Sequence, residues 1–399
     1  MSKFPDLKII YKHYIVITCF IFSIYFFYLL IKFSNSGIDI TDEGYYLNWI
    51  SNPYDYKSSV SQFGFFYHPI FVTFNESIVN LRRINLLFNF IITYWLIYLL
   101  IKPLIKLQKI NFFYHQTLLI GFSLFIFLSI NIFTPNYNSL TLQGLIITCI
   151  GVLIIENSVK KFGFFLISLG GWMVFMGKPS SALILAIIVS VYLMTKKNSF
   201  YSIFLCSLIA CILLLCSSII IDGSPILFFE RILMDMEHYK LFGAGYTVKD
   251  LSKSIITITA KPELQNTYAL FLTIISMLLF FLFLFFLFFL NLKNYKYNYS
   301  FKIIFLSIVL VLFILIQFVN LHWLSIFERY QKLQIFSILL FSIFFVLNFF
   351  NFNLIKTLRA LNLRLILLFL FLPYVYAFGS NVNLLKKSLE AGIFIYWQV

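Results

Sequence analysis

Two adjacent carboxylates, Asp42 and Glu43, follow the long apolar stretch 15–33 and are the first residues here that could carry chemistry. A carboxylate beside a membrane can accept a proton from the hydroxyl or amine of a substrate that a lipid delivers. The sequence around them predicts a short amphipathic helix that opens at this pair and is capped by Thr41 or Asp42. Acidic residues that complement the helix dipole are the simpler explanation of the same pair.

A histidine lies further along the same segment, in an aromatic run at 63–68 that is followed by Pro69. A neutral His68 could contact a sugar or a phosphate, or ligate a divalent metal together with Glu43. An imidazole ring packed on its aromatic neighbours is the alternative interpretation. The sequence leaves the need for a metal open.

Cationic and aromatic residues that suit a lipid-linked phosphate occur beside the ends of other apolar stretches. Lys178 is the only charge in a very short turn, and Arg329 offers a planar fork of donors. Anchoring in the lipid headgroup region would explain such cations equally well. The candidates are Tyr137, Lys178, Arg329 and Tyr330, with Arg82 and Arg83 as a weaker pair.

The composition places these residues in an integral membrane protein. The chain is 61% apolar and only 11% charged, with a mean hydropathy of +0.93, far from the values of a soluble domain. Its apolar stretches of about 18 to 23 residues can cross about 30 Å of hydrocarbon as helices. We therefore expect an all-α polytopic protein, a single transmembrane domain over residues 1–399 with about eleven spans. The predicted spans are 15–33, 84–101, 113–132, 138–155, 162–176, 180–194, 200–221, 268–290, 303–320, 333–350 and 365–378.

The charges between these spans predict an orientation. With the N-terminus in the cytoplasm, that side holds sixteen of the 30 basic residues but only Asp6 and Glu156 of the 15 acidic ones. Basic residues in short loops resist translocation, so we expect a multi-pass protein of the plasma or inner membrane. The candidate residues then all face the outer side.

Two of the outer segments are longer than simple connections. Residues 34–83 hold the acidic pair and His68 and form the candidate catalytic loop. In residues 222–267, apolar positions 226, 229, 232, 233 and 236 suit a helix that lies in the plane of the membrane interface. We expect interfacial helices in both segments and chemistry at the outer membrane surface.

Nucleic-acid binding and disulfide or metal scaffolds are disfavoured. The net charge is +15, but the basic residues come in twos and threes between apolar spans rather than in one stripe. All five cysteines lie in or at the edges of apolar spans, which indicates small packing residues. We expect no nucleic-acid partner.

With its acidic pair directly after the first span, the sequence resembles the GT-C superfamily of membrane glycosyltransferases. The similarity is strongest to protein O-mannosyltransferases and lipid A aminoarabinose transferases. The run 63–70 looks like their aromatic-His/Lys-Pro-Pro-Leu segment, although Ile70 replaces the second proline. Residues 177–180 and the Arg329-Tyr330 pair look like their Lys-Gly/Pro turn and their late Arg-Tyr pair.

The resemblance implies a GT-C-like fold and transfer of a sugar from a polyprenyl-phosphate donor to a glycan, lipid or protein acceptor. By the same resemblance, Asp42 is the base that deprotonates or orients the acceptor, with Glu43 as its neighbour. Polyprenyl phosphate is a good leaving group, so one base and cations for the departing phosphate suffice. The substrate-binding residues so implied are His68, Tyr137, Lys178, Arg329 and Tyr330.

Three other functions remain as alternatives. A transporter or flippase of lipid-linked sugars would need ionisable residues or broken helices inside the bundle, and the predicted span interiors hold almost none. A polymerase or ligase of lipid-linked glycans would work on the same side of the membrane, and the early acidic pair is the main argument against it. A membrane scaffold without activity is the third alternative.

Overall fold

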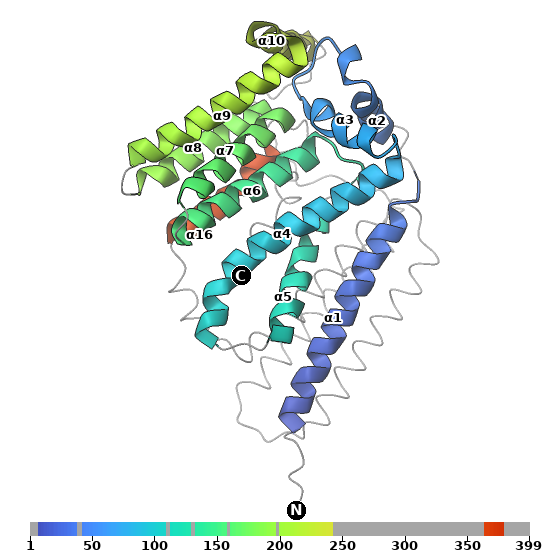
Figure 1. Ribbon diagram of the computed structural model, residues 1–399, viewed down its shortest axis with the longest axis vertical. Coiled ribbons are helices and arrows are strands. Elements are labelled where there is room, and N and C mark those ends of the chain that lie inside the picture. Colours follow the sequence, from blue (N-terminus) through green and yellow to red (C-terminus); the bar gives the residue numbers. More distant parts are fainter. Residues whose placement is uncertain are drawn as a thin grey trace, which may run out of the picture. The chain divides into compact units, whose positions relative to one another are not determined.

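The computed structural model describes residues 7–37, 42–108, 112–128, 132–157, 160–196, 199–241 and 363–378. Within these ranges the chain is helical and has no strand (Figure 1). The described residues from Val16 onward belong to one compact unit, and residues 7–15 belong to a second. The helices are α1 (Leu7–Phe33), α2 (Asp42–Ser51), α3 (Phe63–Thr73), α4 (Ile78–Gln108), α5 (Phe112–Leu124), α6 (Tyr137–Asn157), α7 (Lys160–Gly177), α8 (Pro179–Met194), α9 (Ser199–Asp222), α10 (Pro225–Leu241) and α16 (Leu363–Ala377), with short 3-10 turns at Pro53–Asp55 and Phe125–Leu128.

The helices agree with a helical membrane protein. Three of them contain segments long and apolar enough to cross a membrane, namely Ile78–Lys102, Tyr137–Glu156 and Ser199–Asp222. α7 and α8 contribute shorter apolar segments, Lys161–Gly177 and Pro179–Met194. The predicted span 113–132 is shorter than expected, because α5 ends at Leu124 and gives way to a 3-10 turn. The predicted spans 268–290, 303–320 and 333–350 lie outside the described residues.

The centre of the bundle is the pair α6 and α7, which pack along their length. Close approach depends on glycine, since a Cβ on Gly170 would lie 2.4 Å from the Gly144 carbonyl oxygen and 2.3 Å from Thr148 Oγ1. Gly151 and Gly163 repeat the arrangement, with a Cβ on Gly151 only 2.7 Å from the Gly163 oxygen. Small residues at such a contact let two helices gain van der Waals packing that the bilayer itself does not supply.

The remaining helices are arranged around this pair. α4 packs against α6, α8 and α9 against α7, and α16 against α6 and α8 (Figure 1). α6 is buried on nearly all sides, whereas α9 turns a row of large apolar residues outward. That row consists of Phe204, Leu208, Ile212, Leu215 and Ile219. A helix with such a row exposed is suited to a lipid environment.

Three helices occupy the two long segments that were expected outside the membrane. α2 opens at Asp42, as the sequence predicts, and α3 covers the aromatic run that contains Pro69. α10 covers the second predicted interfacial helix and leaves α9 through Gly223, whose φ of +74° is the left-handed conformation that glycine adopts readily. The helical prediction is therefore confirmed in both segments.

Candidate functional site

The two carboxylates at the start of α2 have different surroundings. Successive residues on a helix point about 100° apart, so neighbours in sequence meet different environments. Asp42 is exposed, whereas only 4% of Glu43 is accessible to solvent. Both carboxylates sit in the first turn, where the helix dipole favours negative charge.

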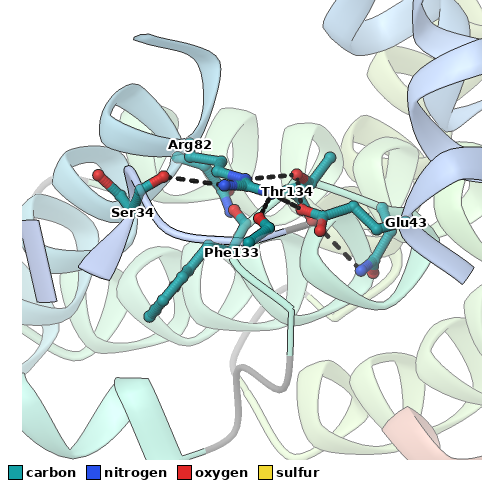
Figure 2. A network of polar contacts seen from close by, with 8 residues as sticks. Ser34, Glu43, Arg82, Phe133 and Thr134 are labelled. Carbon is teal, nitrogen blue, oxygen red and sulfur yellow. Dashed lines mark hydrogen bonds and ion pairs between the residues drawn. The ribbon is translucent and has the colours of Figure 1, made fainter. Parts of the chain in front are cut away.

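Glu43 forms a buried ion pair with Arg82 of α4 (Figure 2). Its Oε1 atom accepts hydrogen bonds from Arg82 Nη2 at 2.7 Å, from Arg82 Nε at 3.0 Å and from the Thr134 hydroxyl. Arg82 also donates to the backbone oxygens of Ser34 and Gly37, at 2.9 and 2.7 Å. The pair thus ties α2, α4 and the segments that end at Gly37 and begin at Ile132 into one network.

This network defines what Glu43 and Arg82 can do. Glu43 is buried and ion-paired with Arg82, so it suits positioning better than proton transfer to a substrate. Arg82 uses all three of its nitrogens within the protein. Its guanidinium therefore holds the fold of the site rather than standing open for a phosphate, the role considered for it from the sequence.

A second cluster begins one turn after Asp42, at Tyr46, and leads to Tyr137 and Lys178. The rings of Tyr46 and Tyr137 lie edge to face with centroids 5.8 Å apart. Burial raises the pKa of the Tyr46 phenol, and the neighbouring charges of Tyr137 and Asp42 and a hydrogen bond to Tyr137 raise it further. Tyr46 therefore stays protonated.

Lys178 closes this cluster from the turn between α7 and α8. Its Nζ lies 5.4 Å from the centre of the Tyr137 ring and 4.7 Å from that of Tyr376, and it donates to the Tyr376 carbonyl oxygen at 3.0 Å. Only 4% of the residue is exposed. A lysine that anchors in lipid headgroups would extend to the surface, so this one has a different role. Tyr137 and Lys178, which the sequence singled out separately, are thus brought together, and Tyr46, one turn after Asp42, packs against Tyr137.

His68 lies on α3 and faces the end of α2. Its Nδ1 is 2.8 Å from the Ile50 carbonyl oxygen, which can only accept, so Nδ1 carries the proton and Nε2 is the acceptor. The imidazole meets the Tyr54 ring edge to face at 6.4 Å. Among the described residues, no three His, Cys, Asp or Glu side chains gather as metal ligands, and Glu43 is taken up by Arg82. Arg329 and Tyr330 lie outside the described residues.

α10 holds the segment that connects α2 with α3. Arg231 of α10 pairs with Asp222 and donates to the Tyr56 carbonyl oxygen. The backbone N–H groups of Ser59 and Val60 donate to the Arg231 carbonyl and to the Asp235 carboxylate, at 3.3 and 2.7 Å. The two long segments that were expected outside the membrane therefore contact each other directly.

A buried chain of hydrogen bonds through two side-chain amides supports the site. The Tyr67 hydroxyl donates to Gln143 Oε1 at 2.8 Å, and Gln143 Nε2 donates to Asn85 Oδ1 at 2.8 Å. Asn85 Nδ2 in turn donates to the Phe133 carbonyl oxygen at 3.0 Å. The chain links α3, α6 and α4 and fixes the segment that carries Thr134.

The sequence interpretation considered Arg82 only as a weaker phosphate candidate and did not pair it with Glu43, and it did not single out Tyr46. An arginine near the start of a long apolar helix needs an anionic partner when it is buried, and this was the signal for Arg82. The position of Tyr46 one turn after Asp42 was the signal for Tyr46. No family model, curated protein or solved structure matches the chain, so the function has to be argued from this geometry.

Proposed function

We propose that this chain is a membrane glycosyltransferase that moves a sugar from a polyprenyl-phosphate donor to an acceptor at the outer face of the plasma or inner membrane. Its fold is then GT-C-like, with about eleven spans and a cytoplasmic N-terminus. The proposal is supported most by one observation: Tyr46, one turn after Asp42 on α2, packs on Tyr137, which in turn packs on Lys178.

In this reaction Asp42 is the general base. The acceptor oxygen forms a bond to the anomeric carbon of the donor sugar while its proton passes to the Asp42 carboxylate. The bond between that carbon and the phosphate oxygen breaks, and polyprenyl phosphate leaves with the electron pair. Asp42 suits the role because it is exposed, whereas the neighbouring carboxylate of Glu43 is enclosed in its network.

The departing phosphate needs positive charge nearby. Lys178 offers an ammonium group held in place by the Tyr376 carbonyl and two aromatic rings, in surroundings with little water to screen it. We assign Arg329 to the same phosphate, with Tyr330 beside it, and His68 and Tyr137 to contacts with the sugars. A requirement for a divalent metal stays open.

The test is transfer of radiolabelled sugar from polyprenyl phosphate in membranes that contain the protein. Asp42→Asn should lower the rate by about 10² to 10⁴ with unchanged insertion and expression. Asp55→Asn is the matched control, because Asp55 is an exposed acid of the same segment. Wild-type rates in both Asp42→Asn and Glu43→Gln would exclude this mechanism. Loss in Glu43→Gln alone would move the base to Glu43 only if that variant is folded and inserted at the wild-type level.

A further inference from the structure

The outward face of α2 carries an unusual set of side chains beside the proposed base. Asp42, Tyr45 and Asn48 follow each other at intervals of three residues, so they share one side of the helix, and all three are exposed. Tyr45 exposes 49% of its surface. Asp42, Tyr45 and Asn48 are called the α2 outer face below.

The aromatic ring of this face is held in a fixed orientation. Tyr45 meets Trp49 edge to face at 5.5 Å and Tyr46 at 5.9 Å. Trp49 is itself buried and stacked on Tyr56 at 4.6 Å, with the ring planes only 6° apart. Gly64 also packs closely on the indole, because a Cβ there would lie 2.1 Å from Trp49 Cδ1. An exposed ring supported in this way loses little freedom when a ligand packs on it.

Asn48 is fixed as well. Its Nδ2 donates to the Tyr56 hydroxyl at 2.6 Å, so the amide is oriented by the same residue that stacks on Trp49. An asparagine amide both donates and accepts, and an ionised aspartate only accepts. The face therefore presents one ring between two polar groups of complementary hydrogen-bonding capacity.

We propose that the α2 outer face binds a carbohydrate, and that the acceptor of the reaction is consequently a glycan rather than a lipid or a protein; this rests on the proposed function. A sugar ring has an apolar C–H face that packs on an aromatic ring, and hydroxyls that both donate and accept. Six residues of helix place Asp42 and Asn48 about 9 Å apart along the axis, room for a disaccharide. The hydroxyl of one sugar would then meet Asp42 while the next unit packs on Tyr45.

The chemistry of this face differs from that of a membrane contact. A surface that enters the headgroup region usually combines large aliphatic or aromatic residues with lysine or arginine. α10 has such large apolar residues exposed, among them Ile226, Phe229 and Leu233. The α2 outer face instead carries a carboxylate and an amide around a single ring, which favours a polar ligand with one apolar side.

Binding can be measured without any transfer. The full chain, purified in detergent, is titrated with maltose, cellobiose, mannobiose and chitobiose, and binding is followed by saturation-transfer NMR. At least one disaccharide should bind saturably, and Tyr45→Ala should weaken it at least about tenfold. Tyr45→Phe keeps the ring and should retain binding. Tyr201→Ala removes a comparably exposed tyrosine from α9 and should change nothing.

Each opposite result overturns the inference. It fails if none of the disaccharides binds, if Tyr45→Ala binds as tightly as the wild type, or if lipids brominated in the acyl chain quench a fluorophore placed at Tyr45. Its failure is separable from that of the proposed function. An essential Asp42 with no disaccharide binding would remove only the carbohydrate site, and disaccharide binding without transfer from any polyprenyl donor would remove only the enzyme.

Discussion

The Arg82 guanidinium lies 2.7 Å from the Glu43 carboxylate, and both side chains are almost completely buried. Charges buried in this way are stable only together, because each would be costly to desolvate alone. Glu43→Gln should therefore destabilise the protein by about 3 to 5 kcal/mol, since it leaves the Arg82 charge without its counter-ion. The measurement is the free energy of unfolding in mixed micelles.

The control for the ion pair is Glu237→Gln, because Glu237 is an exposed acid of α10. The double substitution Glu43→Gln with Arg82→Gln should be less harmful than the sum of the two single changes, which measures the coupling of the pair. A Glu43→Gln protein within about 0.5 kcal/mol of the wild type would contradict the structure.

The hydrogen bonds of Arg231 to Asp222 and to the Tyr56 carbonyl should limit the mobility of the segment between α2 and α3. Arg231→Lys keeps the charge but cannot hold Asp222 and the Tyr56 carbonyl with one planar group. We expect faster amide hydrogen exchange across residues 56–62, measured by mass spectrometry. Glu230→Gln on the same helix should leave the exchange as it is, and an unchanged rate in Arg231→Lys would show that α10 does not hold this segment.

Two adjacent glycines of α7 give a matched test of the helix contact. A Cβ on Gly170 would collide with Gly144 and Thr148, whereas a Cβ on Gly171 would meet nothing within 4 Å. Gly170→Ala should thus lower the melting temperature, and Gly171→Ala should keep or raise it, because alanine favours a helix by up to about 1 kcal/mol. Equal effects of the two changes would contradict the close packing of α6 on α7.

The predicted outer location of α2 and α3 can be tested with impermeant thiol reagents. In a variant without native cysteines, Asn52→Cys and Gly245→Cys should react in sealed cells, and Asn294→Cys should react only after permeabilisation. Asn52 is exposed directly after α2, so its reactivity depends on the side of the membrane and not on burial. Labelling of Asn294→Cys in sealed cells would reverse the predicted orientation.

The sequence predicted where helices form but not how their polar residues meet. Hydropathy and turn residues placed α6, α7, α8 and α9 within about two residues of their observed ends, and the acidic pair located the start of α2. α4 extends several residues beyond both ends of the predicted span 84–101. The pairing of Glu43 with Arg82 joins residues far apart in the chain, and no local pattern encodes it. The same holds for the amide chain from Tyr67 to Gln143, because apolar periodicity does not tell which buried faces are opposed.

Lys178 gives the sharpest test of the phosphate assignment. Lys178→Ala should raise the KM for the lipid donor by at least about tenfold, because it removes a cation from surroundings that screen charge poorly. Lys178→Arg restores the charge and separates loss of charge from loss of packing on the Tyr137 and Tyr376 rings. Arg329→Lys should impair donor use despite its charge, since an ammonium cannot bind a phosphate through a planar fork. If Lys178→Ala and Arg329→Lys both use the donor as the wild type does, the phosphate lies elsewhere, and Arg83 becomes the next residue to substitute.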